Sequence, residues 1–248
     1  MIKSVSKRKA IKIYRKNRKE YQKKIQGRTN YTFFLDRVYD YPCLEDRFES
    51  AGQLGIYFWQ DLWASRLICE KNPLEHYDIG SSMSFIGHLA TFRDRIHLID
   101  VRPLEYDIPG VSFYQADATN LDNISSDSVE SLSALCSLEH FGLGRYGDPI
   151  DPDSWYRAMK SIVRVIKPGG DAYISVPIGW EHVEYDAHRI FFAQTVIEAF
   201  SPMELVSLSC VCLHSDEVIE ENVPIHKYDD EINHADRFGL FHFHKIDE

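Results

Sequence analysis

The chain has 248 residues, which is enough for one large domain or two small ones. Its 14 Phe, 14 Tyr and 4 Trp exclude a chain that is disordered throughout. No stretch approaches the roughly 20 apolar residues that span a bilayer, and no apolar run follows the charged N-terminus as in a secretory signal. We therefore expect a cytoplasmic protein.

The net charge of −10 is divided unevenly along the chain. Residues 1–28 contain 12 Lys and Arg against a single acid, Glu20, so the remaining residues carry 16 basic and 37 acidic side chains, a net charge of −21. An acidic body argues against an enzyme whose main surface follows nucleic-acid phosphates. We expect no nucleic-acid partner.

The basic N-terminal segment has the pattern of a one-sided helix. Five residues recur at steps of three and four: Ile11, Tyr14, Arg18, Tyr21 and Ile25. Such a helix could lie on an anionic membrane, which would place the protein at the inner face of the membrane, or in the acidic groove of a partner protein. Alternatively, its tyrosines pack on the acidic body.

A second amphipathic pattern predicts a helix from residue 56 to about residue 70, and Asn72-Pro73 follows it. The composition changes at this point. We therefore divide the chain into a basic helix and helical extension, residues 1–72, and a larger domain, residues 73–248.

In the larger domain, short apolar strands alternate with helices. Strands are predicted at residues 75–79, 96–100, 111–115, 129–137, 171–176, 203–213 and 239–246, and helices at residues 84–93, 152–166 and 193–200. Asp151 and Pro152 are suited to start the second helix, and Lys167-Pro168-Gly169-Gly170 to end it. The alternation predicts an α/β fold with a doubly wound, mostly parallel, Rossmann-like sheet of seven strands. The last two strands should pair antiparallel at one edge, and the histidines His234, His242 and His244 should lie on a solvated face or on that edge.

Polar residues follow several predicted strands, where a sheet of this kind binds its ligand. Gly80, in the turn Asp78-Ile79-Gly80, allows a ligand to approach the backbone closely. Asp100, twenty residues later, has the position of an acid that accepts bonds from ribose hydroxyls. Asp117 ends the third strand and could accept a bond from an adenine amine. Together their order and spacing predict a bound adenosine.

The turn after the first strand discriminates between two kinds of cofactor. A dinucleotide site requires Gly-x-Gly-x-x-Gly to seat a pyrophosphate on a helix N-terminus. Here no glycine follows Gly80 until Gly87. S-adenosylmethionine carries no phosphate and tolerates a looser turn.

These residues resemble the motifs of class I S-adenosylmethionine-dependent methyltransferases. The resemblance covers residues 74–246 and includes Asp78-x-Gly80, Asp100, Asp117 and the Lys167–Gly170 turn, but Ser82 stands where many members have a second glycine. It implies S-adenosylmethionine as the cofactor. The contacts that it implies are made by Asp78, Gly80, Ser81, Ser82, Asp100, Val101, Asp117, Ala118, Ser137 and Leu138.

A narrower resemblance rests on the run from Ser137 to Asp153, together with Val176–Gly179 and His188-Arg189-Ile190. This pattern resembles an uncharacterised family of methyltransferase-like proteins, a domain of unknown function often found among bacterial surface-polysaccharide genes. It implies O-methylation of a sugar or surface-glycan precursor.

The segment from Phe141 to Asp153 contains three glycines, two prolines and four charged side chains. Long loops of this kind in compact domains are usually functional, so we expect it to lie over the donor methyl group and shape an acceptor pocket. The expected acceptor contacts are Glu139, Arg145, Tyr146, Asp151 and Arg189. Alternatively, the loop is a rigid cap held by pairing of Arg145 with Asp148.

Methyl transfer is an in-line displacement that depends mainly on alignment, but a sugar hydroxyl also requires a base or a metal. His140 is the preferred base, and activity should then follow a titration near neutral pH. His182 and His188 are reserves. Asp148 or Asp151 with Glu181, His182 and Glu184 could instead hold a divalent metal through oxygen ligands, although no spacing demands a metal and the five cysteines form no CxxC pair.

Two other functions remain open. One is a scaffold that retains the methyltransferase fold without catalysis and uses its basic arm to hold partners. The other is a sugar-nucleotide-modifying enzyme of another class, such as an oxidoreductase, which would need a pyrophosphate site and a Tyr-x-x-x-Lys pair.

Overall fold

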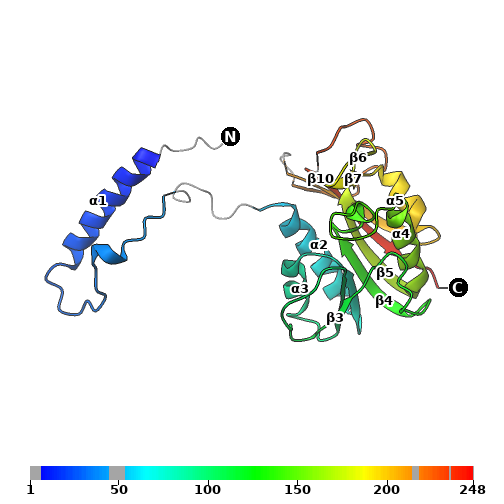
Figure 1. Cartoon of the computed structure of the whole chain (residues 1–248), viewed down its shortest axis with the longest axis horizontal. Helices are drawn as coiled ribbons and strands as arrows, with labels where there is room; N and C mark the ends of the chain where they lie inside the picture. The colour runs from blue at the N-terminus through cyan, green and yellow to red at the C-terminus, as the bar shows by residue number, and fades with distance from the viewer. Residues whose placement is uncertain (1–6, 45–53, 214–217, 235, 248) are drawn as a thin grey trace. The chain divides into compact units, whose positions relative to one another are not determined.

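The structure is a computed structural model that describes residues 7–44, 54–213, 218–234 and 236–247 (Figure 1). The chain forms two compact units, residues 1–53 and residues 54–248. No helix among the described residues is both long enough and apolar enough to cross a membrane.

The first unit consists of helix α1, Lys7–Ile25, and a segment that turns back along it and contains the short 3₁₀ helix η1, Arg37–Tyr39. The predicted stripe of α1 contacts this returning segment. Arg18 donates to both carboxylate oxygens of Asp40, at 2.8 and 2.6 Å, and the hydroxyl of Tyr21 is hydrogen-bonded to that of Tyr31. The stripe therefore packs within its own unit.

Helix α2, Ile56–Lys71, begins at the predicted residue and belongs to the second unit. It buries Ile56, Ala64 and Ile68, and it packs against helix α3, Met83–Leu89. The structure thus divides the chain between Gln53 and Leu54, earlier than the boundary after residue 72 that composition indicates, because α2 contributes to the core of the larger domain.

The second unit is built on a sheet of eight strands in the order β3-β2-β1-β4-β5-β10-β8-β9, and β6 and β7 form a separate hairpin. The strands are β1 His76–Ile79, β2 Ile96–Asp100, β3 Val111–Gln115, β4 Val129–Leu135, β5 Ile166–Pro177, β6 His182–Glu184, β7 His188–Ile190, β8 Glu204–Cys212, β9 Ile219–Glu220 and β10 Arg237–His244. Strands β1 to β5 pair in parallel, which confirms the predicted doubly wound sheet.

The C-terminal strand differs from the prediction in its position. β10 inserts between β5 and β8 and pairs antiparallel with both, so it is not an edge strand. As a result His242 is buried, stacks on Tyr173 and lies 2.8 Å from a carboxylate oxygen of Asp171. The expectation that His242 lies on a solvated edge is wrong.

Helices cover both faces of this sheet. Helices α4, Ser154–Val165, and α5, Ala193–Phe200, lie on one face, and α2 and α3 lie on the other (Figure 1). The buried residues of α4 recur at helical spacing: Ala158, Met159, Ile162, Val163 and Val165. Each face therefore has its own apolar core.

Residues 167–170 do not form the separate turn that their composition predicts. Helix α4 ends at Val165, and β5 begins at once and bulges, since Val129 pairs with Ile166 but Ser131 pairs with Asp171. Gly169 has a φ of +75° and donates its backbone N–H to the carbonyl of Lys245, at 2.7 Å. The bulge thus connects β5 to the end of β10.

Candidate functional site

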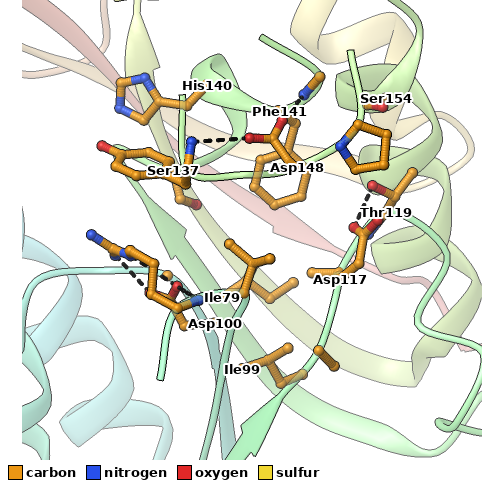
Figure 2. A pocket seen from close by; sticks show the side chains of 18 of the residues that line it. Ile79, Ile99, Asp100, Asp117, Thr119, Ser137, His140, Phe141, Asp148 and Ser154 are labelled. Atoms are coloured by element: carbon orange, nitrogen blue, oxygen red, sulfur yellow. Dashed lines mark hydrogen bonds and ion pairs between the residues drawn. The ribbon is translucent and has the colours of Figure 1, made fainter. Parts of the chain in front are cut away.

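A pocket lies beyond the carboxyl ends of β1, β2 and β4, and the loop of residues 141–153 forms one of its walls (Figure 2). Of the residues predicted from the sequence, it is lined by Gly80, Asp100, Val101, Asp117, Ala118, Ser137, His140, Tyr146, Asp148 and Asp151. The topology places the pocket where a doubly wound sheet binds ligands.

Gly80 directly follows β1 with a φ of +64°, in the left-handed region that favours glycine. A Cβ atom at this position would lie 3.3 Å from Cβ of Ser137, so a side chain here would reduce the space between Gly80 and Ser137 in the pocket. The hydroxyl of Ser137 is buried and has no hydrogen-bond partner among the described residues. This open backbone and the unpaired hydroxyl fit a polar ligand that approaches the sheet closely.

Asp78 stabilises this turn through hydrogen bonds and does not line the pocket. Its carboxylate is fully buried and accepts hydrogen bonds from the backbone and hydroxyl of Ser81 and from the hydroxyl of Ser133. Burial raises the pKa of Asp78 to about 6, although the bonds from Ser133 and Ser81 oppose that shift. The structure therefore gives Asp78 and Ser81 a role in joining β1 to β4.

Ser82 also lies outside the pocket. Its hydroxyl accepts from the backbone of Phe85 at 3.1 Å, which caps α3, and it donates to Asp61 of α2 at 2.8 Å. The capping hydrogen bond at the start of α3 therefore explains why serine occupies this position. Leu138 likewise lies in the apolar core and not on the pocket wall.

Asp100, at the end of β2, faces the pocket but is paired with Arg102. Its Oδ1 accepts from the backbone and Nε of Arg102, at 2.8 and 3.0 Å, and its Oδ2 accepts from Nη2 at 2.6 Å. Oδ2 also lies 3.8 Å from the position of a Cβ at Gly80, which places it over the first turn. A carboxylate oxygen has two acceptor positions, so Oδ2 retains one for a ligand.

Asp117 lies on the opposite side of the pocket from His140, with Val101 and Ala118 among the other lining residues (Figure 2). Its Oδ1 accepts from the backbone and hydroxyl of Thr119, at 2.8 and 2.6 Å. These bonds fix the carboxylate, and no described residue binds its Oδ2. This oxygen is suited to accept a bond from an amine.

The loop of residues 141–153 is held by Asp148, which accepts backbone hydrogen bonds from Gly142, Gly144 and Tyr146 at 2.8, 3.3 and 3.2 Å. These bonds engage both carboxylate oxygens and give Asp148 a structural role rather than a catalytic one. Asp151 pairs with Arg157 of α4. The expected pairing of Arg145 with Asp148 is wrong, since Asp148 binds the backbone.

Arg145 instead donates to the carbonyl of Ala187, at 3.0 Å. The ring of Tyr146 has the guanidinium of Arg102 at 4.7 Å and that of Arg145 at 5.1 Å from its centroid. Arg189 is buried and donates to the carbonyl of Phe141. Arg189 therefore anchors the start of the loop, whereas Tyr146 and Arg102 line the pocket and Arg145 does not.

His140 lines the pocket and is oriented by its own hydrogen bond. Its Nδ1 lies 2.6 Å from the carbonyl of Ala187, so Nδ1 carries the proton and Nε2 is an acceptor. Burial lowers the pKa of His140 to about 4, although the bond to Ala187 opposes the shift. Burial therefore places the titration of this imidazole below the near-neutral range that the sequence predicts.

Glu139 precedes His140 and is almost completely buried. Its Oε2 has no hydrogen-bond partner among the described residues, and its Oε1 lies 3.7 Å from Nε2 of His140. Burial raises the pKa of Glu139 to about 8. At neutral pH the proton of this pair therefore resides on the carboxyl group and not on the imidazole, and perturbed groups of this kind are typical of functional sites.

His182 and His188 lie on the β6–β7 hairpin and do not line the pocket. They gather with His234 around Glu184, whose carboxylate lies 2.9 Å from His188 and 2.7 Å from His234. Within the described ranges, no group of three or more His, Cys, Asp or Glu side chains is arranged to hold a metal ion. The structure offers no support for the metal alternative.

Several pocket residues escape the sequence reasoning, among them Arg102 and Cys136. Cys136 directly follows β4 with a φ of +52°, an uncommon conformation for a residue other than glycine, and its thiol lies 2.9 Å from Oε1 of Gln60. Arg102 could have been found from its place two residues after Asp100. Gln60 and Asp61 are buried on α2 without lining the pocket, and the apolar pattern of that helix does not single them out.

The sheet order, the first turn with Gly80, the acid that ends β2 and the acid that follows β3 define a class I methyltransferase fold. Three solved structures share this fold at low sequence identity. A chain from the complex of the Haloferax volcanii Trm112 methyltransferase activator with its assigned methyltransferase is 17% identical, with 77% of this chain and 90% of that chain covered and a TM-score of 0.50. The [4+2]-cyclase SpnF is 18% identical, with 81% of this chain and 86% of the SpnF chain covered and a TM-score of 0.53. A protein from Bacillus halodurans C-125 that is assigned as a methyltransferase is 14% identical, with 75% and 99% covered and a TM-score of 0.51.

Residues 110–223 match a family model described as a Caenorhabditis protein of unknown function, DUF268. The match includes the loop of residues 141–153 and the β6–β7 hairpin, so it covers the segments that carry the narrower resemblance. A comparison with curated proteins finds no match.

Proposed function

We propose that this protein is an S-adenosylmethionine-dependent methyltransferase that methylates a hydroxyl group of a sugar or glycan precursor. The observation that supports the cofactor is the joint placement of Gly80, Asp100 and Asp117 around one pocket at the switch point of the sheet. When bound, S-adenosylmethionine supplies an electrophilic methyl group.

The chain's own residues suit distinct parts of this cofactor. Oδ2 of Asp100 is proposed to accept a bond from the ribose hydroxyls, and Oδ2 of Asp117 one from the adenine amine. The unpaired hydroxyl of Ser137 and the open backbone of Gly80 are suited to the methionine end. In the turn after β1 no glycine follows Gly80 until Gly87, and Ser82 caps α3 where a dinucleotide site has its second glycine, which favours the phosphate-free cofactor over a dinucleotide.

His140 is proposed to accept the proton of the acceptor hydroxyl at Nε2. A base with a pKa near 4 is weak, but an ionised Glu139 at 3.7 Å would stabilise the imidazolium that forms. We therefore expect turnover to rise as the pH passes through about 8, where Glu139 loses its proton. In Glu139→Gln this rise should be absent.

A calorimetric titration of the full chain with S-adenosylmethionine, S-adenosylhomocysteine and NAD tests the proposal. We expect saturable binding of the first two and none of NAD. Binding of NAD alone would indicate a nucleotide-dependent enzyme of another class, and failure to bind any of the three would indicate a non-catalytic scaffold. Either result would overturn the proposal.

A further inference from the structure

We propose that the first unit, residues 7–44, is a docking surface for an anionic lipid membrane. Helix α1 carries most of the basic residues of the N-terminal 28, and its exposed side chains are predominantly Lys and Arg. Among its basic residues, Arg18 and Lys24 form ion pairs within the part of the chain that the structure describes. The other cations are available to an anionic surface, whereas the rest of the protein is acidic.

The predicted stripe of α1 is not the surface that would enter the membrane. Arg18 is held by Asp40, and the ring of Tyr21 packs at 6.2 Å against that of Tyr31. A hydrogen bond to Asp40 also raises the pKa of Tyr14, so Tyr14 contacts the returning segment as well. These contacts pin the returning segment to the helix, so the apolar contribution must come from that segment.

The returning segment supplies such a contribution. Five large apolar or aromatic residues within nine positions are between 72% and 88% exposed: Phe33, Phe34, Val38, Tyr39 and Tyr41. Soluble monomers rarely expose so many large apolar side chains in one short stretch, and such clusters mark interaction sites. Here the cluster lies in the same small unit as the cationic helix.

The two observations together favour lipid over another polyanion. Basic side chains are attracted to anionic headgroups, and Phe and Tyr side chains lose contact with water when they enter the interfacial region. A nucleic acid would use the cations but would gain nothing from the aliphatic Val38. None of these residues lines the pocket, so membrane binding does not depend on the enzymatic activity.

The test is co-sedimentation of the full chain with vesicles of phosphatidylcholine that contain about 30% phosphatidylglycerol, compared with pure phosphatidylcholine. We expect binding to the anionic vesicles only, and release at about 0.5 M salt. A variant with Lys→Gln at six exposed positions should lose at least about a hundredfold in affinity, since each cation near the surface contributes about fivefold and about three of the six suffice for that loss. The six positions are Lys7, Lys9, Lys12, Lys16, Lys19 and Lys23.

Two matched controls distinguish the loss of charge, or of apolar contact with the membrane, from a loss of folding. Lys→Arg at the same six positions should retain binding. The triple variant Phe33→Ser, Phe34→Ser, Val38→Ser should lose at least about tenfold. Its control carries Ser at three comparably exposed positions of the second unit, which are Leu74, Tyr106 and Ile232.

Three results would overturn the proposal. One is equal binding to neutral vesicles. Another is undiminished vesicle binding by the Phe33, Phe34 and Val38 triple variant, which would show that charge alone accounts for the binding. The third is binding of a single-stranded RNA as tight as that of anionic vesicles and unaffected by the triple variant, which would indicate a polyanion site.

Discussion

Carboxylates at the ends of the strands have different roles, and the sequence alone does not separate them. Asp78, Asp100 and Asp117 each lie at or near the carboxyl end of a strand, yet Asp78 is buried and accepts hydrogen bonds from two serines, while the other two face the pocket. The distinction depends on β4, which brings Ser133 next to Asp78 from 55 residues away. Spacing along the chain therefore predicts the location of the site better than it predicts the role of each residue.

At Asp100, the prediction concerns cofactor affinity. Asp100→Ala removes a charged acceptor whose hydrogen bonds are each worth about 1.5 to 3 kcal/mol. We expect S-adenosylhomocysteine to bind at least about tenfold more weakly by calorimetry, with an unchanged unfolding temperature. Asp107→Ala, an exposed acid outside the pocket, is the matched control. Unchanged affinity in Asp100→Ala would remove this residue from the site.

At Glu139, the prediction concerns stability as a function of pH. Because folding raises the pKa of this carboxyl from 4.5 to about 8, the folded protein binds its proton more tightly than the unfolded chain does. The contribution of Glu139 to stability is therefore complete below about pH 4.5 and is lost progressively as the pH rises through about 8.

Glu139→Gln removes this dependence. Compared with the natural chain, the variant should gain stability between pH 5 and pH 9, on the order of 1.4 kcal/mol for each pKa unit of the shift. Urea unfolding at several pH values measures the difference. If the difference in free energy of unfolding between the two proteins did not change with pH, the carboxyl would not be buried in a raised-pKa state.

At the scale of elements, local patterns predict local structure well. Strands β2 and β3 and helix α5 have the predicted bounds, because their apolar periodicity is unambiguous and turn residues flank them. The apolar run Phe238–Phe243 is typical of a strand buried on both faces, but the insertion of β10 between β5 and β8 depends on pairing between distant segments, so the run does not predict its neighbours. The bulge at residues 167–170 has the same origin, since Lys245 of the C-terminal segment stabilises it.

The loop of residues 141–153 depends on Asp148. Asp148→Ala removes the acceptor for three backbone N–H groups, and we expect faster hydrogen exchange at Gly142, Gly144 and Tyr146 by about tenfold or more. Asp153→Ala is the matched control, because Asp153 lies in the same loop and its side chain makes no capping hydrogen bond. Equal exchange in the two variants would contradict the role of Asp148.

At the scale of the whole molecule, composition and packing divide the chain at different places. Composition changes near Asn72-Pro73, but α2 carries the buried polar residues Gln60 and Asp61, which bond to residues at the ends of strands in the larger domain. Ser175 of β5 donates to Gln60 at 2.7 Å, and Ser82 donates to Asp61. Through these bonds, helix α2 helps to hold the residues that surround the pocket in place.

Two truncations test this division directly. Removal of residues 1–53 should leave a folded protein that binds S-adenosylhomocysteine with unchanged affinity, since the second unit keeps both of its apolar cores.

Removal of residues 1–72 also deletes Ile56, Ala64 and Ile68 from the core. Burial of each such side chain contributes about 1 to 3 kcal/mol, so the loss of several is comparable with the whole stability of a domain. The shorter protein should therefore be unfolded or insoluble by circular dichroism and size-exclusion chromatography. If it instead folded and bound the cofactor as well as the longer one, α2 would be an appendage and the division indicated by composition would hold.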